Sequence, residues 1–178
     1  MTIWVALLRG VNVGGITIRS ADLGALFRDE LGFEAVTTVL ASGNVRFETD
    51  AVPAHRAALK SRIEQALRVR FEDDVRIVLV TLDELQRAID GFPFDAEDAA
   101  RQPWVVFCVD TATRDELIAA AASFDDALDP VAAGGGVVYW NPQKGSSTET
   151  PFAKILAKPA YRTRTTNRNL RTLGRIAR

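Results

Sequence analysis

Two short polar segments have the residue types of an anion-binding site. Residues 9–15 read RGVNVGG and residues 42–44 read SGN, so the candidate ligand groups are Arg9, Asn12, Gly14, Gly15, Ser42 and Asn44. Glycine loops near a helix N-terminus present backbone N–H groups to an anion, and a nearby arginine adds charged donors. An alternative stays open, in which the glycines only allow positive φ angles in tight turns and the asparagines bond to loop backbone.

Groups for acid–base and nucleophilic catalysis are scarce. The chain has one histidine, His55, and one cysteine, Cys108, and neither completes a Ser-His-Asp or Cys-His arrangement. The carboxylates follow no pattern that pairs them for general acid–base work. The same scarcity argues against a His-rich or multi-Cys metal site and an internal disulfide. We therefore assign no catalytic residue, expect no metal and no cofactor, and leave open whether the protein is an enzyme.

The net charge of −1 conceals a strong asymmetry along the chain. Residues 150–178 contain eight basic residues and no acid, whereas residues 1–149 contain 14 basic and 23 acidic residues. Such a basic segment can attract phosphates, nucleic acid or an acidic partner, or it can dock on the acidic body of its own chain. We favour docking on the body, and the acidity of that body makes nucleic acid the less favoured partner.

The composition is that of a globular protein. Hydrophobic residues make up 47% of the 178 residues and charged residues 25%, and a chain of this length can bury a sizeable core without disulfides. No apolar run approaches the roughly 20 residues that span a bilayer. Met1 leads directly into an apolar run without a basic region before it, so we expect no signal peptide, no membrane association and a cytoplasmic location.

Hydrophobic periodicity predicts six elements in the first 80 residues. Apolar or alternating runs predict strands at 3–8, 34–41, 44–49 and 75–80, and helical spacing predicts helices that begin at Ser20 and Pro53. The order βαββαβ is the split βαβ pattern of ferredoxin-like folds.

The pattern then recurs. A capping box at Thr81–Glu84 opens a short helix, and the Gly- and Pro-containing residues 91–103 are the expected linker. A strand at 104–109, a second capping box at 113–116, a hairpin around residues 134–136 and a helix capped by Thr150 follow. We expect an edge strand near 161–165, then a last helix capped by Thr166 or Asn167. The predicted fold is α+β, with two ferredoxin-like halves with mainly antiparallel sheets (1–90 and 104–178) plus a C-terminal helix.

Topology places the two polar segments together. In a split βαβ unit the third strand lies antiparallel between the first two, so the end of strand one and the strand 2–3 hairpin emerge at the same edge. The first strand is apolar on both faces, and helices cover only one face, so the other must pack on the second half, a partner chain or a ligand. A homodimer through this apolar face is one alternative. We expect Trp4 to pack in the core rather than to stack on RNA bases.

Three segments together resemble the uncharacterised, mostly bacterial family called domain of unknown function 1697. Residues 7–15 (LLRGVNVGG) are similar to its L-R-G-I-N-V-G-G signature, residues 40–47 (LASGNVRF) to L-Q-S-G-N-V-x-F, and residues 166–172 (TNRNLRT) to T-x-R-N-x-x-T. The resemblance implies an α+β fold of ferredoxin-like parts and no established activity. Ala41, Leu170 and Arg171 depart from it, standing where Gln, Trp and Asn are expected.

The third segment extends the candidate site. If its helix docks near the shared edge, the loop and hairpin donors join Arg168, Asn169 and Thr172 in one cluster. Such donors suit a phosphate, a nucleotide or a carboxylate. The leading hypothesis is a module that binds an anionic small ligand, with nucleic-acid binding or a homodimeric interaction protein as alternatives.

Overall fold

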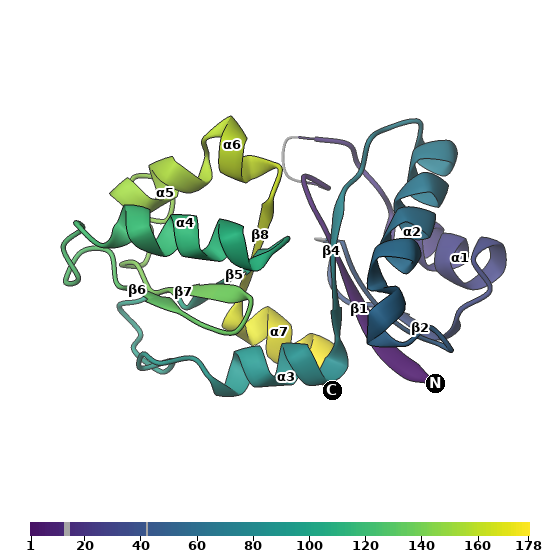
Figure 1. Ribbon diagram of the computed structural model, residues 1–178, viewed down its shortest axis with the longest axis horizontal. Coiled ribbons are helices and arrows are strands. Elements are labelled where there is room, and N and C mark those ends of the chain that lie inside the picture. The colour runs from purple at the N-terminus through teal and green to yellow at the C-terminus, as the bar shows by residue number, and fades with distance from the viewer. Residues whose placement is uncertain (13–14, 42) are drawn as a thin grey trace. The chain divides into compact units, whose positions relative to one another are not determined.

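The computed structural model describes residues 1–12, 15–41 and 43–178, which form two compact units. The first unit consists of Met1–Leu85 with Arg175–Arg178, and the second of Gln86–Gly174. Each unit has its own four-stranded sheet, and both are visible in Figure 1. Among the described residues, no helix is both long and apolar enough to cross a membrane.

The first unit has the predicted βαββαβ order. Its elements are β1 (Thr2–Leu8), α1 (Ser20–Ala25) continued by a π-helix (Leu26–Glu30), β2 (Glu34–Thr38), β3 (Asn44–Thr49), a 3-10 turn (Pro53–His55) with α2 (Arg56–Phe71), and β4 (Ile77–Thr81). The strands lie in the order β2-β3-β1-β4, and every neighbouring pair is antiparallel. This is the sheet of a ferredoxin-like fold, so the prediction for this half is confirmed.

The core of the first unit lies between the sheet and the helices α1 and α2, which cover the same face (Figure 1). Trp4 and Phe47 are fully buried there, and the Trp4 indole Nε1 donates to the carbonyl of Ala51 at 2.9 Å. Phe33 stacks on Phe47 with ring centroids 4.5 Å apart, and Phe27 meets Phe47 edge-on. The expectation that Trp4 packs in the core is confirmed.

The second unit repeats the topology with shorter elements. Helix α3 (Leu82–Asp90) runs from the first unit into the second, and residues 91–103 contain no helix or extended strand. The unit continues with β5 (Trp104–Cys108), α4 (Thr111–Ala121), β6 (Val131–Ala133), β7 (Val137–Trp140), α5 (Pro151–Leu156), α6 (Pro159–Arg162), β8 (Thr165–Asn169) and α7 (Leu170–Ala177). The antiparallel order β6-β7-β5-β8 matches the first unit. The α+β fold class is therefore confirmed.

Two of the three predicted helix caps are confirmed. The Thr81 hydroxyl accepts from the amide of Glu84, whose carboxylate accepts from the Thr81 amide, and the Thr150 hydroxyl accepts from the amide of Ala153. The predicted capping box at 113–116 is wrong. Asp110 caps α4 instead, because its carboxylate accepts from both the amide and the hydroxyl of Thr113. Ser20 also is not a cap but the first residue of α1.

The C-terminal segment differs from its prediction by about one helical turn. Residues 159–162 form the short helix α6, and the edge strand is β8 at Thr165–Asn169. Thr166 and Asn167 therefore lie in the strand and do not cap the last helix. The physical reason is packing, because Tyr161 lies against the core of the second unit and Pro159 suits the first turn of a helix.

Candidate functional site

The end of β1 and the β2–β3 hairpin meet at one edge of the first sheet, as predicted. Leu7 lies opposite Asn44 in the antiparallel register, and the Leu8 amide donates to the Gly43 carbonyl at 2.8 Å. Gly43 has a φ of +76°, and a Cβ there would lie 2.8 Å from the Cβ of Leu8. A glycine is therefore required for the hairpin to approach β1 this closely.

The Asn12 side chain fastens the first polar loop. Its amide nitrogen donates to the carbonyls of Ile18, at 3.0 Å, and Ala41, and its oxygen accepts from the Ile18 amide at 2.9 Å. Asn12 also adopts a φ of +59°, which asparagine tolerates better than most residues. Both amide hydrogens are thus used within the loops, and Asn12 positions the loop against the hairpin.

Asn44 and Gly15 have comparable positions in the backbone framework. Asn44 is almost fully buried, its side chain donates to the Val39 carbonyl at 2.8 Å, and its own carbonyl accepts from the Val39 amide. A Cβ on Gly15 would collide with the Gly10 carbonyl oxygen. These contacts give both residues a structural role, and direct contact with a ligand stays a prediction.

Three residues of the first polar set remain as predicted donors. Arg9 follows β1, its backbone amide donates to the Arg76 carbonyl at 2.9 Å, and its side chain is half-buried. Gly14 and Ser42 lie outside the described residues.

Arg168 lies in the second unit, in β8 opposite Val105, rather than at the start of the last helix as expected. Only 7% of the residue is exposed. Its guanidinium Nη1 donates to the Thr166 hydroxyl at 2.8 Å and to the Asn167 carbonyl at 2.9 Å. Burial lowers the pKa of this guanidinium to about 10, because the charged form loses hydration inside the protein.

The register places Arg168 on the face of the second sheet away from α4 and α5. Tyr139, Val105 and Arg168 lie opposite one another on β7, β5 and β8, whereas the neighbouring Val106 and Val138 belong to the core under the helices. Tyr139 is nearly buried, and burial raises the pKa of its hydroxyl, with a smaller contribution from the charge of Asp90. This row therefore carries a buried cation and a buried phenol.

Asn169 and Thr172 follow Arg168 along the chain. The Asn169 side-chain oxygen accepts from the Arg171 amide at 3.0 Å, so Asn169 caps α7. Thr172 lies half-buried within α7. Whether Arg168, Asn169 and Thr172 act on the same ligand as the residues of the first unit stays a prediction.

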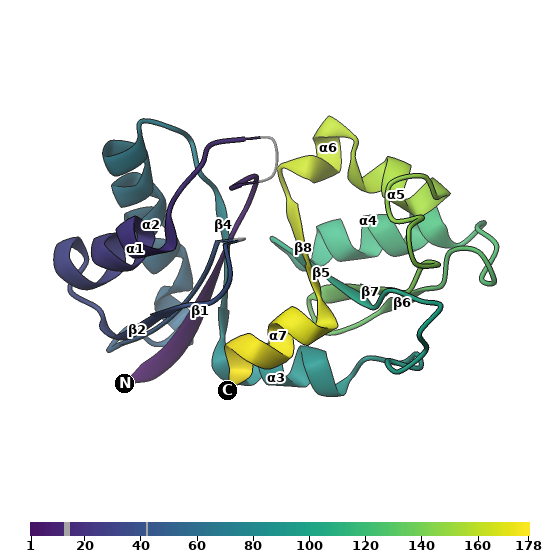
Figure 2. The ribbon, with the colours of Figure 1, turned by 180° about the vertical axis from the view of Figure 1, so that it is seen from behind.

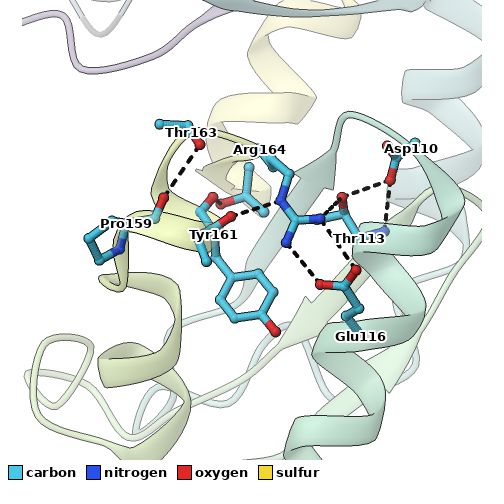
Figure 3. A network of polar contacts seen from close by, with 9 residues as sticks. Asp110, Thr113, Glu116, Pro159, Tyr161, Thr163 and Arg164 are labelled. Atoms are coloured by element: carbon cyan, nitrogen blue, oxygen red, sulfur yellow. Dashed lines mark hydrogen bonds and ion pairs between the residues drawn. The ribbon is translucent and has the colours of Figure 1, made fainter.

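A polar network fixes the start of the strand that carries Arg168 (Figure 3). The Arg164 guanidinium donates to the Thr113 hydroxyl at 3.1 Å, to Glu116 at 2.8 Å and to the Ala160 carbonyl at 2.7 Å. The Arg164 carbonyl accepts from the Val109 amide, which pairs β8 with the end of β5. Arg164 thus ties α4, α6 and β8 together, and its ion pair shows one basic residue of the C-terminal segment bound to an acid.

Cys108 and His55 show no features of catalytic groups. Burial raises the pKa of the Cys108 thiol to about 12, so it stays protonated at neutral pH. His55 is exposed at the start of α2. Among the described residues, no group of three His, Cys, Asp or Glu side chains has the geometry to hold a metal ion.

The apolar face of the first sheet that was considered for a homodimer is buried within the single chain. Val5 and Leu7, on the face away from α1 and α2, have no exposed surface. A homodimer through this face stays a prediction, and the oligomeric state in solution would test it.

Three comparisons relate the chain to known proteins. A family model described as "Protein of unknown function (DUF1697)" matches residues 1–139. The conserved bacterial protein SP0830 from Streptococcus pneumoniae has a similar solved structure, with a TM-score of 0.80 and 24% sequence identity over 99% of this chain and 97% of that one. At this identity the likeness shows the fold alone. No curated protein matches the sequence.

Proposed function

Because the chain belongs to the DUF1697 family, whose function is unknown, we propose from its own residues that it binds an anionic small ligand. The ligand is a phosphate, a nucleotide or a carboxylate, and Arg168 is its main anchor. Arginine suits this role because its planar guanidinium donates two parallel hydrogen bonds to such oxygens.

The observation that carries the proposal is the buried guanidinium of Arg168. Its lowered pKa means that the surroundings as a whole disfavour the charged form. A bound anion would return part of this free energy, because opposite charges interact more strongly in a desolvated site than in water. A buried cation with a perturbed pKa is therefore a candidate for a functional site.

Neighbouring groups would complete the ligand contacts. The Thr166 hydroxyl accepts from Arg168 and can still donate its own hydrogen to an anion. In the first unit, Arg9, Gly14, Gly15 and Ser42 are the proposed further donors, and Asn12 and Asn44 hold the loops that carry them. The set includes no evident general base or activated nucleophile, so the proposal is for binding and names no reaction.

Ligand-dependent thermal stability tests the proposal. We expect at least one of inorganic phosphate, adenosine triphosphate and citrate to raise the melting temperature of the wild-type protein, because a ligand that binds only the folded state stabilises it. Arg168→Lys keeps the charge but loses the bidentate fork, so its shift should be smaller. Arg101→Lys is the matched control, since Arg101 also lies in the second unit and donates to two backbone carbonyls.

The contrary outcomes are clear. The proposal is wrong if none of the three ligands shifts the wild type, or if Arg168→Lys responds as strongly as Arg101→Lys. A double-mutant cycle with Arg9→Ala then asks whether Arg9 acts on the same ligand, because residues that share one ligand have non-additive effects.

A further inference from the structure

The exposed side of residues 151–163 forms a basic ridge on the second unit. Its cations are Lys154 in α5, Lys158 between the helices and Arg162 in α6, and all three are exposed. The opposite side of the same segment is apolar, because Phe152, Ala153, Ile155, Leu156 and Tyr161 lie against the core of the second unit. The packing therefore turns the basic side toward solvent.

Backbone hydrogen bonds keep the three cations in a regular row. The Lys154 amide donates to the Thr150 carbonyl, the Lys158 amide to Ile155, and the Arg162 amide to Lys158. Figures 1 and 2 both show α5 and α6 as consecutive segments beside α4. A spacing of four residues corresponds to a rise of about 6 Å in a helix, so the charges follow one line along the segment.

The charge of the ridge is not neutralised within the described part of the chain. Residues 150–174 include no acid. Arg164 in this stretch pairs with Glu116. In contrast, none of the described acids forms an ion pair with Lys154, Lys158 or Arg162. The ridge therefore presents three cations to a partner.

We propose that this basic ridge binds the phosphate backbone of a nucleic acid duplex without reading its base sequence. Backbone binding needs only a row of cations, which release counterions from the phosphates. Between the cations the exposed side chains are small, namely Pro151, Ala157, Pro159 and Ala160, so a rigid backbone can approach closely.

The distribution of aromatic residues argues against recognition of unstacked bases. Such recognition needs exposed rings, and none of the exposed large hydrophobic residues in the described ranges is aromatic. Phe107 and Tyr139 lie on the two central strands of the second sheet but are nearly fully buried. An acidic protein partner is disfavoured because the ridge offers no large apolar side chain as an anchor.

Charge reversal on the ridge tests this proposal in the full chain. The variant carries Lys154→Glu, Lys158→Glu and Arg162→Glu, and the matched control carries Arg19→Glu, Arg28→Glu and Arg70→Glu, which are exposed arginines of the first unit with the same change in net charge. We expect fluorescence anisotropy with a labelled mixed-sequence DNA duplex at low salt to show about tenfold or greater loss of affinity for the ridge variant relative to the control. The slope of log affinity against log salt should fall by about 2 to 3.

Further arms separate the alternatives. Lys154→Arg with Lys158→Arg should keep the affinity, because the charge is retained, and Arg168→Lys should keep it too, because the small-ligand proposal concerns a different residue. The proposal is overturned if wild type does not bind the duplex, if the ridge variant binds as well as the control, or if polyglutamate competes as effectively as unlabelled duplex. Melting curves of both triple variants verify that they fold.

Discussion

The two units of the protein share one strand order but bury different kinds of side chain. The first unit fills its core with apolar groups, including Trp4 and the Phe27–Phe33–Phe47 cluster. The two buried charged residues among those described, Asp129 and Arg168, both belong to the second unit. Topology therefore does not decide where polar chemistry lies, and the second unit carries more of it on the same scaffold.

The units also differ in how their charges are arranged. The first unit has 12 basic and 12 acidic residues, and the second has 10 basic and 11 acidic residues. In the second unit, all 11 acids precede residue 150, and six of the ten basic residues follow it. The asymmetry of the whole chain thus originates in the second unit, which carries both the buried arginine and the basic ridge.

The two buried charges of the second unit have opposite energetic consequences. Asp129 accepts hydrogen bonds from the Trp140 indole and the Phe152 amide, both at 2.6 Å, at the start of α5. These bonds compensate for its burial. Arg168 lies in surroundings that lower its pKa, so its charged form costs the folded state free energy. We expect Asp129 to serve stability and Arg168 to serve ligand binding.

The largest expected effect on stability is from Asp129→Ala. The substitution leaves two buried N–H donors without an acceptor and should lower the free energy of unfolding by about 2 to 4 kcal/mol. Asp126→Ala is the control, because Asp126 is exposed in the same loop region. Denaturant unfolding of the two variants measures the difference. Equal stabilities would show that the buried carboxylate is not a structural group.

Arg168→Met should change the stability far less, by about 1 kcal/mol or less near neutral pH, because replacing a costly buried charge with an apolar side chain is often neutral. The pH dependence has a definite sign. The pKa of Arg168 is about 10 in the folded protein and higher when unfolded, so deprotonation above about pH 10 relieves the folded state first.

The stability of the wild type relative to Arg168→Met should therefore rise between about pH 9 and 11. Denaturant unfolding of both proteins across this range measures it. A difference that stays constant or falls would contradict the assignment of a desolvated cation.

The smallest expected effect is from Glu116→Gln, which removes the ion pair with Arg164. Both side chains are partly exposed, and such pairs contribute little to stability. The unfolding midpoint should match that of the control Asp115→Asn. A clear loss confined to Glu116→Gln would mean that the network of Figure 3 contributes more to the second unit than surface charges usually do.

Periodicity was sufficient to predict the topology but not the C-terminal strand. The apolar runs of β1, β4 and β5 mark buried strands directly. Strand β8 reads TTNRN and has no apolar alternation, so nothing local identifies it as a strand. Its position depends on pairing with β5, some 60 residues away, which a local pattern does not reveal.

The candidate site was predicted in location more than in role. The meeting of the β1 loop with the hairpin followed from strand order alone. The sequence could not show that Asn12 and Asn44 bond to backbone carbonyls, because a loop asparagine and a ligand-binding asparagine look alike. Glu116 was misread for a similar reason, since two overlapping capping patterns competed and Asp110 formed the cap.

Isothermal titration of the anion that most raises the melting temperature tests the central claim most directly. The account predicts measurable binding to the wild type, unchanged binding to Arg101→Lys, and affinity lower by about tenfold in Arg168→Lys, the loss expected from one charge-assisted hydrogen bond. Equal affinity in Arg168→Lys and Arg101→Lys would contradict the assignment of Arg168 as the anchor.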